Sequence, residues 1–230
     1  MKPWEAVEVE VIRTSVTFWV LVLAGSVSFA ETVGFDKDAH GAIASGWKAA
    51  VTHEGAAPRW EVVADESAPS KPNVLAQLSS EPKGAQFPLA VYQGVTCQNG
   101  DVSVKFKPVS GKEDQAAGLV WRYRDENNYY IVRANALEDN VVLYKVEGGQ
   151  RTALAPKGTP AGTYGVKHKV PGGRWSTLRV LFEASRFTVF FEGKELFVVE
   201  DPTFTGAGRV GLWTKADSVT HFDDFQIVAK

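Results

Sequence analysis

The sequence lacks most of the patterns that indicate a catalytic or nucleic-acid-binding protein. Cys97 is the only cysteine among 230 residues, so no disulfide can form within the chain. The four histidines have no spacing typical of a zinc site, and there is neither a Gly-x-Ser-x-Gly elbow nor a phosphate-binding loop. The formal net charge of −2 provides no basic stripe for nucleic acid. No histidine or basic residue lies near Cys97 in sequence, so we expect a buried, unreactive thiol.

The N-terminal thirty residues differ in character from the rest. Residues 16–24 form an apolar run, which follows Arg13 and precedes the small-x-small segment that ends at Ala30. This pattern predicts a signal peptide over residues 1–30, cleavage after Ala30 and export to the periplasm or the extracellular space. The run is shorter than the about 20 residues of a membrane span, so we expect no span after cleavage. Three glutamates precede Arg13 where a signal should be positive, which keeps an N-terminal anchor and a buried strand open as alternatives.

From Trp47 onward the sequence has the alternation of short β-strands. Residues 101–107 alternate strictly, with Val102 and its i+2 neighbours apolar. Further strands are expected at 118–124, 129–135, 141–146, 175–182, 186–191, 196–199, 208–213 and 219–227. The Gly148-Gly149 pair predicts a tight hairpin, because glycine readily adopts the positive φ that such a turn requires. No segment after the apolar run has sustained helical periodicity.

This succession of strands predicts an all-β, two-sheet antiparallel sandwich. No linker or internal repeat divides it, so residues 31–230 are expected to form a single domain and a monomer. Four tryptophans are assigned to the core between the sheets: Trp47, Trp60, Trp175 and Trp213.

Several motifs are similar to those of a known superfamily. Gly34-Phe35-Asp36, residues 118–130 and residues 209–225 resemble concanavalin A-like lectin/glucanase domains of secreted bacterial proteins. The resemblance implies a jelly-roll sandwich and extends to the 3-keto-disaccharide hydrolase family, which shares this fold. These motifs are mostly structural, so they predict the fold better than the activity.

The catalytic residues of those relatives are not found. The resemblance to glucanases implies a Glu-x-Asp-x-x-Glu strand, whose alternation places its carboxylates on one face, and no such run occurs here. The resemblance to keto-sugar hydrolases implies an Asn-Ser-Gly segment, of which this chain retains only Gly118, together with the later Arg122. Most of these adjacent acidic pairs are interpreted as turn or edge residues: Glu113-Asp114, Glu138-Asp139, Glu200-Asp201 and Asp223-Asp224. No catalytic residue is therefore assigned.

A structural calcium site is a further possibility. Asp36 and Asp38 share an N-terminal loop, and Asp224 lies on the last predicted strand. Terminal strands of a jelly roll are commonly neighbours, so these carboxylates would supply the oxygen ligands that Ca²⁺ prefers. Alternatively, the two loop aspartates are turn residues, and Asp223-Asp224 is a β-bulge without a metal.

Polar and aromatic side chains mark the predicted central strands. Alternation puts Arg122 and Arg124 on one face of their strand, with Trp121 and Tyr123 on the other. On the following strands, one face carries the remaining candidates: Tyr129, Arg133, Asn135 and Tyr144. Guanidinium and amide groups pair with sugar hydroxyls, and aromatic rings stack on sugar faces. The alternative is an ordinary exposed sheet.

Three functional hypotheses follow. The first is an exported, non-catalytic module that binds a glycan or another extracellular polymer on one sheet face. The second is a glycoside-acting enzyme of the 3-keto-disaccharide hydrolase type, which requires a histidine or carboxylate facing Arg122 or Arg133. The third is a structural or adhesion component of the cell envelope.

Overall fold

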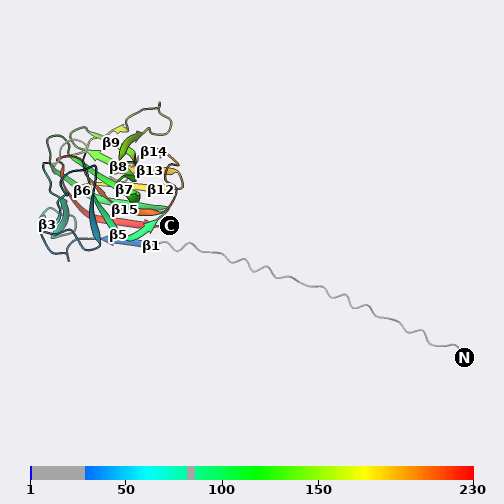
Figure 1. Ribbon diagram of the computed structural model, residues 1–230, viewed down its shortest axis with the longest axis horizontal. Helices are drawn as coiled ribbons and strands as arrows, with labels where there is room; N and C mark the ends of the chain where they lie inside the picture. The colour runs from blue at the N-terminus through cyan, green and yellow to red at the C-terminus, as the bar shows by residue number, and fades with distance from the viewer. Residues whose placement is uncertain (2–28, 82–85) are drawn as a thin grey trace.

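The computed structural model describes residues 1, 29–81 and 86–230, and within them two antiparallel sheets pack face to face (Figure 1). The first sheet has the order β14 (Lys194–Glu200), β13 (Arg186–Phe191), β12 (Ser176–Glu183), β6 (Gly100–Ser110), β16 (Val219–Ala229), β4 (Asn73–Gln77) and β3 (Trp60–Ala64), and β1 (Phe29–Val33) also pairs with β16. The second has the order β10 (Gln150–Leu154), β9 (Asn140–Glu147), β8 (Asn128–Asn135), β7 (Ala116–Asp125), β15 (Gly208–Trp213), β5 (Phe87–Cys97) and β2 (Trp47–Thr52), and β11 (Val166–Lys167) pairs with β9. The predicted all-β two-sheet sandwich is confirmed.

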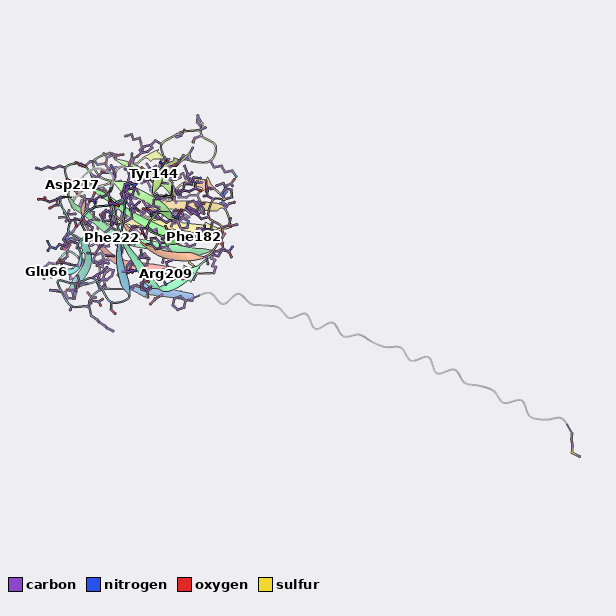
Figure 2. The ribbon with its side chains drawn as sticks, viewed as in Figure 1. Glu66, Tyr144, Phe182, Arg209, Asp217 and Phe222 are labelled. Carbon is purple, nitrogen blue, oxygen red and sulfur yellow. The ribbon has the colours of Figure 1, made fainter. Side chains whose placement is uncertain are left out.

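The main core lies between the two sheets. Val102, Val104 and Phe106 of β6 are buried there, whereas the residues between them are half-buried on the opposite face. Phe182 of β12 and Phe222 of β16 belong to the same core and lie well inside the molecule (Figure 2). Strand alternation therefore directs every second side chain of β6, each of them apolar, into the interior. Cys97 is buried in this core as predicted, and burial raises the pKa of its thiol to about 11.

The Gly148-Gly149 hairpin prediction is confirmed. The turn joins β9 to β10, and φ is 56° at Gly148 and 81° at Gly149. The interpretation of Asp223-Asp224 as a bulge is also confirmed. The register of β16 with β6 shifts between Asp223 and Gln226, and Asp224 has a φ of 46°.

A second apolar cluster covers the outer face of the second sheet, the face turned away from the first sheet. It contains Leu89, Val120, Ile131 and Val142, together with several aromatic rings. The sheet curls over this face: Thr52 Oγ1, at the edge strand β2, lies 2.7 Å from the hydroxyl of Tyr129 on β8. At the other edge, Arg151 of β10 lies 4.5 Å from the Tyr144 ring centroid and 4.7 Å from that of Phe87 on β5. Side chains of both edge strands thus reach across the outer face to strands on the other side of the sheet.

The tryptophan assignments hold for two of four positions. Trp47 and Trp60 lie in the core between the sheets. Trp213 is fully buried, but it belongs to the cluster on the outer face of the second sheet, so its assignment was wrong. Trp175 is only half-buried, and its indole nitrogen donates to Ser67 Oγ at 3.1 Å near the surface. Sequence alternation identifies apolar residues without distinguishing between two buried faces of a curled sheet.

Of the predicted export segment 1–30, only residues 1, 29 and 30 are described. Phe29 and Ala30 begin β1, which pairs with the C-terminal part of β16 (Figure 1). Among the described residues, no helix has the length and apolar character needed to cross a membrane.

Candidate functional site

Three of the predicted ligand-binding residues converge on the outer face of the second sheet. Arg133 and Asn135 alternate along β8, and their pairing partners on β9 are Val142 and Asn140. Tyr144 lies on the same face of β9, with its ring centroid 5.7 Å from the Arg133 guanidinium carbon. The prediction that these side chains share a face is confirmed.

The short turn between β8 and β9 adds a carboxylate to this group. Arg133 donates to the Glu138 carboxylate at 3.2 and 2.7 Å, which forms a two-pronged ion pair. Asn135 and Asn140 donate to the same carboxylate at 3.2 and 2.8 Å. The side-chain amide oxygen Oδ1 of Asn140 accepts from Arg133 at 2.8 Å. Glu138 is therefore held by three neighbours on two adjacent strands.

A second carboxylate approaches from a remote loop. Asp114 accepts from Asn135 at 2.6 Å and from Lys215 Nζ at 2.5 Å, and it lies 3.9 Å from Arg133. The loop is fixed by Asp217, whose carboxylate accepts the backbone N–H groups of residues 112, 113 and 114. We call the set Asp114, Arg133, Asn135, Glu138, Asn140 and Lys215 the Arg133 cluster. It contains two carboxylates and two cationic groups, and hydrogen bonds join its members from β8, β9 and the loops that carry Asp114, Glu138 and Lys215.

Exposed groups border the Arg133 cluster. The Tyr164 hydroxyl is 2.5 Å from that of Tyr144, yet 48% of Tyr164 is exposed. Leu137, next to Glu138, is 50% exposed. The side chain of Arg133 has no exposure, whereas that of Glu138 is 37% exposed and that of Lys215 is 22% exposed. A ligand approaching from solvent would thus meet an aromatic ring, a carboxylate and an ammonium group.

The charges of the cluster set the ionisation of Glu138. Burial raises the pKa of its carboxyl, but hydrogen bonds with Arg133 and the charge of that guanidinium outweigh burial and lower the pKa overall. Glu138 is therefore a carboxylate at neutral pH and acts as a hydrogen-bond acceptor. Burying such a network gives little or no net stability, so its presence fits a functional site better than a stabilising core.

Arg122 is placed differently from the prediction. A β-bulge in β7 gives this residue a φ of 49° and puts Trp121 and Tyr123 on opposite faces, so their predicted shared face was wrong. The fully buried Arg122 side chain donates to the carbonyl of Gln98 at 3.0 Å, that of Phe204 at 2.6 Å and that of Ala184. It therefore ties three loops together and is closed to solvent.

The remaining two predicted ligand residues lie outside the Arg133 cluster. Tyr129 is fully buried in the outer-face cluster, where its hydroxyl contacts Thr52. Arg124 is exposed, and its guanidinium carbon lies 4.9 Å from the Phe204 ring centroid. Burial raises the pKa of Tyr129, which keeps its hydroxyl protonated.

The three predicted metal ligands are engaged separately. Asp36 accepts from Asn73 N at 3.0 Å, Asp38 accepts from Ser45 N at 2.9 Å, and Asp224 pairs with Lys105 at 2.9 Å. Among the described residues, no group of three or more His, Cys, Asp or Glu side chains is arranged to hold a metal. Calcium binding stays a prediction.

His221 belongs to a cluster of charged side chains on the first sheet. Its Nδ1 lies 2.7 Å from Asp65, which also accepts from Lys107 and from Ser67 Oγ. Burial raises the pKa of Asp65, but hydrogen bonds from Lys107, His221 and Ser67 outweigh it and hold the pKa well below its usual range. Burial also lowers the pKa of His221 against the opposing effect of Asp65.

Asp65→Asn is expected to lower the free energy of unfolding at pH 7 by about 1–3 kcal/mol, because charge-assisted hydrogen bonds are lost. A carboxyl with a lowered folded-state pKa stabilises above its unfolded pKa of about 3.9, and this contribution is lost as pH falls further. Urea unfolding from pH 7 to pH 2.5 should show the two proteins converging in acid. Glu66→Gln, at an exposed neighbour (Figure 2), should change stability by less than about 0.5 kcal/mol. A gap that stays constant with pH would contradict the prediction.

Sequence reasoning did not identify Asp114, Glu138, Lys215 or Tyr164 as site residues. The interpretation of Asp114 and Glu138 as turn or edge residues gives their place in the chain correctly, since both lie between strands. The available signal was the turn 136–139, which follows two predicted polar site residues and contains Glu138. Short turns bring their side chains beside the ends of the strands that they join.

Comparison with solved structures shows that the two-sheet arrangement of this chain is a known fold. A carbohydrate-binding module, CBM66, from Bacillus subtilis matches with a TM-score of 0.57 and 17% identity, over 79% of this chain and 94% of that chain. The chain has a galectin-like sandwich fold. A Bacillus subtilis protein of unknown function with a galectin-like fold has a TM-score of 0.51 and 10% identity, with 80% and 90% covered. A protein of unknown function from Shewanella oneidensis MR-1 has a TM-score of 0.55 and 12% identity, with 88% and 87% covered.

The sequence comparisons give no family. The chain matches no protein-family model and no curated protein sequence. Identities of 10–17% to the structural neighbours establish the fold alone.

Proposed function

We propose that this protein is a non-catalytic glycan-binding module and that it binds through the Arg133 cluster. The observation that carries the proposal is the juxtaposition of prearranged polar groups with the exposed Tyr164 ring. Glu138 accepts hydrogen bonds from sugar hydroxyls, Lys215 donates to sugar oxygens, and Tyr164 stacks on an apolar sugar face. Arg133 and Asn135 fix the orientation of the Glu138 carboxylate, so little ordering entropy is lost on binding.

One of the three structural neighbours supports the same class of ligand. CBM66 from Bacillus subtilis is named a carbohydrate-binding module. Export fits this proposal, because extracellular glycans would then be within reach. Cleavage after Ala30 would leave Glu31 as the first residue, still paired within β1, with its carboxylate accepting from the Tyr92 hydroxyl at 2.8 Å.

Tyr164→Ala is expected to weaken glycan binding about tenfold, because the stacking ring is lost. Tyr164→Phe retains the ring and loses only the hydrogen bond to Tyr144, so it should bind within about threefold of the parent protein. Isothermal titration against a panel of neutral oligosaccharides, chosen after affinity electrophoresis on polysaccharide gels, measures both. Flat titrations across the panel, or equal affinity of the alanine variant, would exclude the proposed site.

One observation also favours the enzyme hypothesis. That hypothesis requires a carboxylate facing Arg122 or Arg133, and Glu138 lies at hydrogen-bond distance from Arg133. The lowered pKa of Glu138 is the opposite of what a general acid needs, so we place binding first. Release of monosaccharide from a 3-keto-disaccharide, followed by chromatography, distinguishes the two. An envelope component without a sugar ligand would show neither binding nor turnover.

A further inference from the structure

A separate cleft lies toward the other end of the outer face of the second sheet. Arg209 of β15 is in this cleft, and Figure 2 shows it well apart from Tyr144 of the Arg133 cluster. The cleft has a volume of about 280 Å³ and is lined from β2, β5, β7 and β15.

Cationic groups dominate the lining of the cleft. Lys48, Arg124 and Arg209 contribute positive charges, and none of them forms an ion pair with a carboxylate in the described part of the chain. Of the two acidic residues in the lining, Asp125 is engaged within its own turn, where it accepts from Asn127 N and Asn128 Nδ2, both at 2.8 Å. The second acidic residue is Glu126, so three cationic and two acidic side chains give the lining a net charge of +1.

Arg209 is held in position by a neighbouring amide. Gln93 Nε2 donates to the Val91 carbonyl at 2.8 Å, which fixes the amide, and Gln93 Oε1 accepts from Arg209 Nη1. The remaining guanidinium N–H groups are free to face the cleft. A fixed planar guanidinium is suited to two-pronged contacts with a carboxylate or a sulfate group.

The Tyr123 hydroxyl supplies a neutral donor. Burial, together with the negative charges of Glu126 and Asp125, raises the pKa of Tyr123 to about 12, so its O–H is retained at neutral pH. Its ring is half-buried and lies 6.0 Å from that of Tyr129, which limits its movement. A phenol and a guanidinium side by side can both donate to an oxyanion, and neither of these two groups is itself negatively charged.

We propose that this cleft binds an oxyanion carried by a sugar, either a uronate carboxylate or a sulfate ester, with Arg209 as the principal contact and Lys48 and Tyr123 as supporting donors. The inference rests on the proposed glycan-binding function but concerns a second site, separate from the Arg133 cluster. Neutral sugars would bind at the cluster alone, and acidic sugars would gain affinity from the cleft.

The test uses the full chain and three probes: galacturonate trisaccharide, a sulfated galactose trisaccharide and the neutral galactose trisaccharide. Arg209→Gln should weaken binding of the acidic probes about tenfold and leave the neutral probe unaffected, since one charged hydrogen-bonding partner is lost. Arg174→Gln, at an exposed arginine outside the cleft, is the matched control and should change neither. Affinity for the acidic probes should also fall as NaCl is raised.

The outcomes separate this inference from the proposed function. If Arg209→Gln weakens the binding of only one acidic probe, the oxyanion of that probe, carboxylate or sulfate, is the group that the cleft recognises. If it weakens the binding of both, the cleft accepts either group. Equal binding of acidic and neutral probes, or acidic binding unchanged by Arg209→Gln, overturns the inference even where Tyr164→Ala still weakens neutral glycans. Binding of the acidic probes that depends on Arg209, together with no binding of the neutral probe, would instead support the cleft and refute the Arg133 cluster as a glycan site.

Discussion

Arg122→Met is expected to lower the free energy of unfolding by about 3–5 kcal/mol. The arginine side chain is fully buried and donates to three backbone carbonyls, from Gln98, Ala184 and Phe204. Methionine has a similar length but no hydrogen-bond donor. The three carbonyls therefore lose their donor at a place where the parent side chain has no exposure to solvent. Each unsatisfied buried carbonyl costs about 1–3 kcal/mol.

Urea unfolding followed by tryptophan fluorescence measures this loss. Arg124→Met, two residues along the same strand and exposed, is the matched control and should stay within about 0.5 kcal/mol of the parent. Arg122→Lys should remain destabilised, because one ammonium group cannot reproduce the guanidinium fork to three separate loops. If Arg122→Met unfolds with the same midpoint and slope as the parent, the side chain is not the tie between these loops.

Arg133→Met is the second large effect, with an expected loss of about 3–5 kcal/mol of stability and of the proposed neutral-glycan binding. The substitution leaves the carboxylates of Asp114 and Glu138 without the guanidinium between them. The loss is costly because the Asp114 carboxylate, only 2% exposed, stays in a poorly solvated position, whereas Glu138 is partly solvated. Arg133 and Glu138 are therefore expected to be strongly coupled.

A double-mutant cycle tests this coupling. Arg133→Met combined with Glu138→Met should be more stable than Arg133→Met alone, since an apolar pair replaces the remaining unpaired charge. Neither variant is expected to bind neutral glycans, because the acceptor is displaced in one and absent in the other. Additive effects of the two substitutions on the free energy of unfolding would show that Arg133 and Glu138 act independently and would contradict the cluster as described.

The positions of the strands could be predicted from sequence because the determinants are local. The predicted strand 186–191 coincides with β13, and 208–213 coincides with β15, while 101–107 lies within β6. Apolar alternation and glycine turns depend on residues only a few positions apart. The shared face of Arg133, Asn135 and Tyr144 follows from the same rule, applied across one hairpin.

The bulge at Arg122 was not predictable in this way. The alternation of residues 118–124 predicts a regular strand, but β7 is distorted where Gly208 of β15 passes against it. A Cβ at Gly208 would lie 2.4 Å from the carbonyl carbon of Arg122, so only glycine allows this approach. The bulge turns Arg122 from a predicted ligand residue into a buried tie, and it frees Tyr123 to line the Arg209 cleft.

The sequence alone determined that this chain is an antiparallel two-sheet sandwich, where most of its strands run, and that Arg133, Asn135 and Tyr144 share a face. Only the tertiary structure decided which loops complete the site: Asp114 and Lys215 are 101 residues apart in sequence yet form a hydrogen bond at 2.5 Å. It also decided that the outer face of the second sheet is largely filled by its own aromatic side chains. The physical reason is that alternation fixes the direction of each side chain within a strand, whereas curling of the sheet and packing of distant loops depend on contacts that no local pattern records.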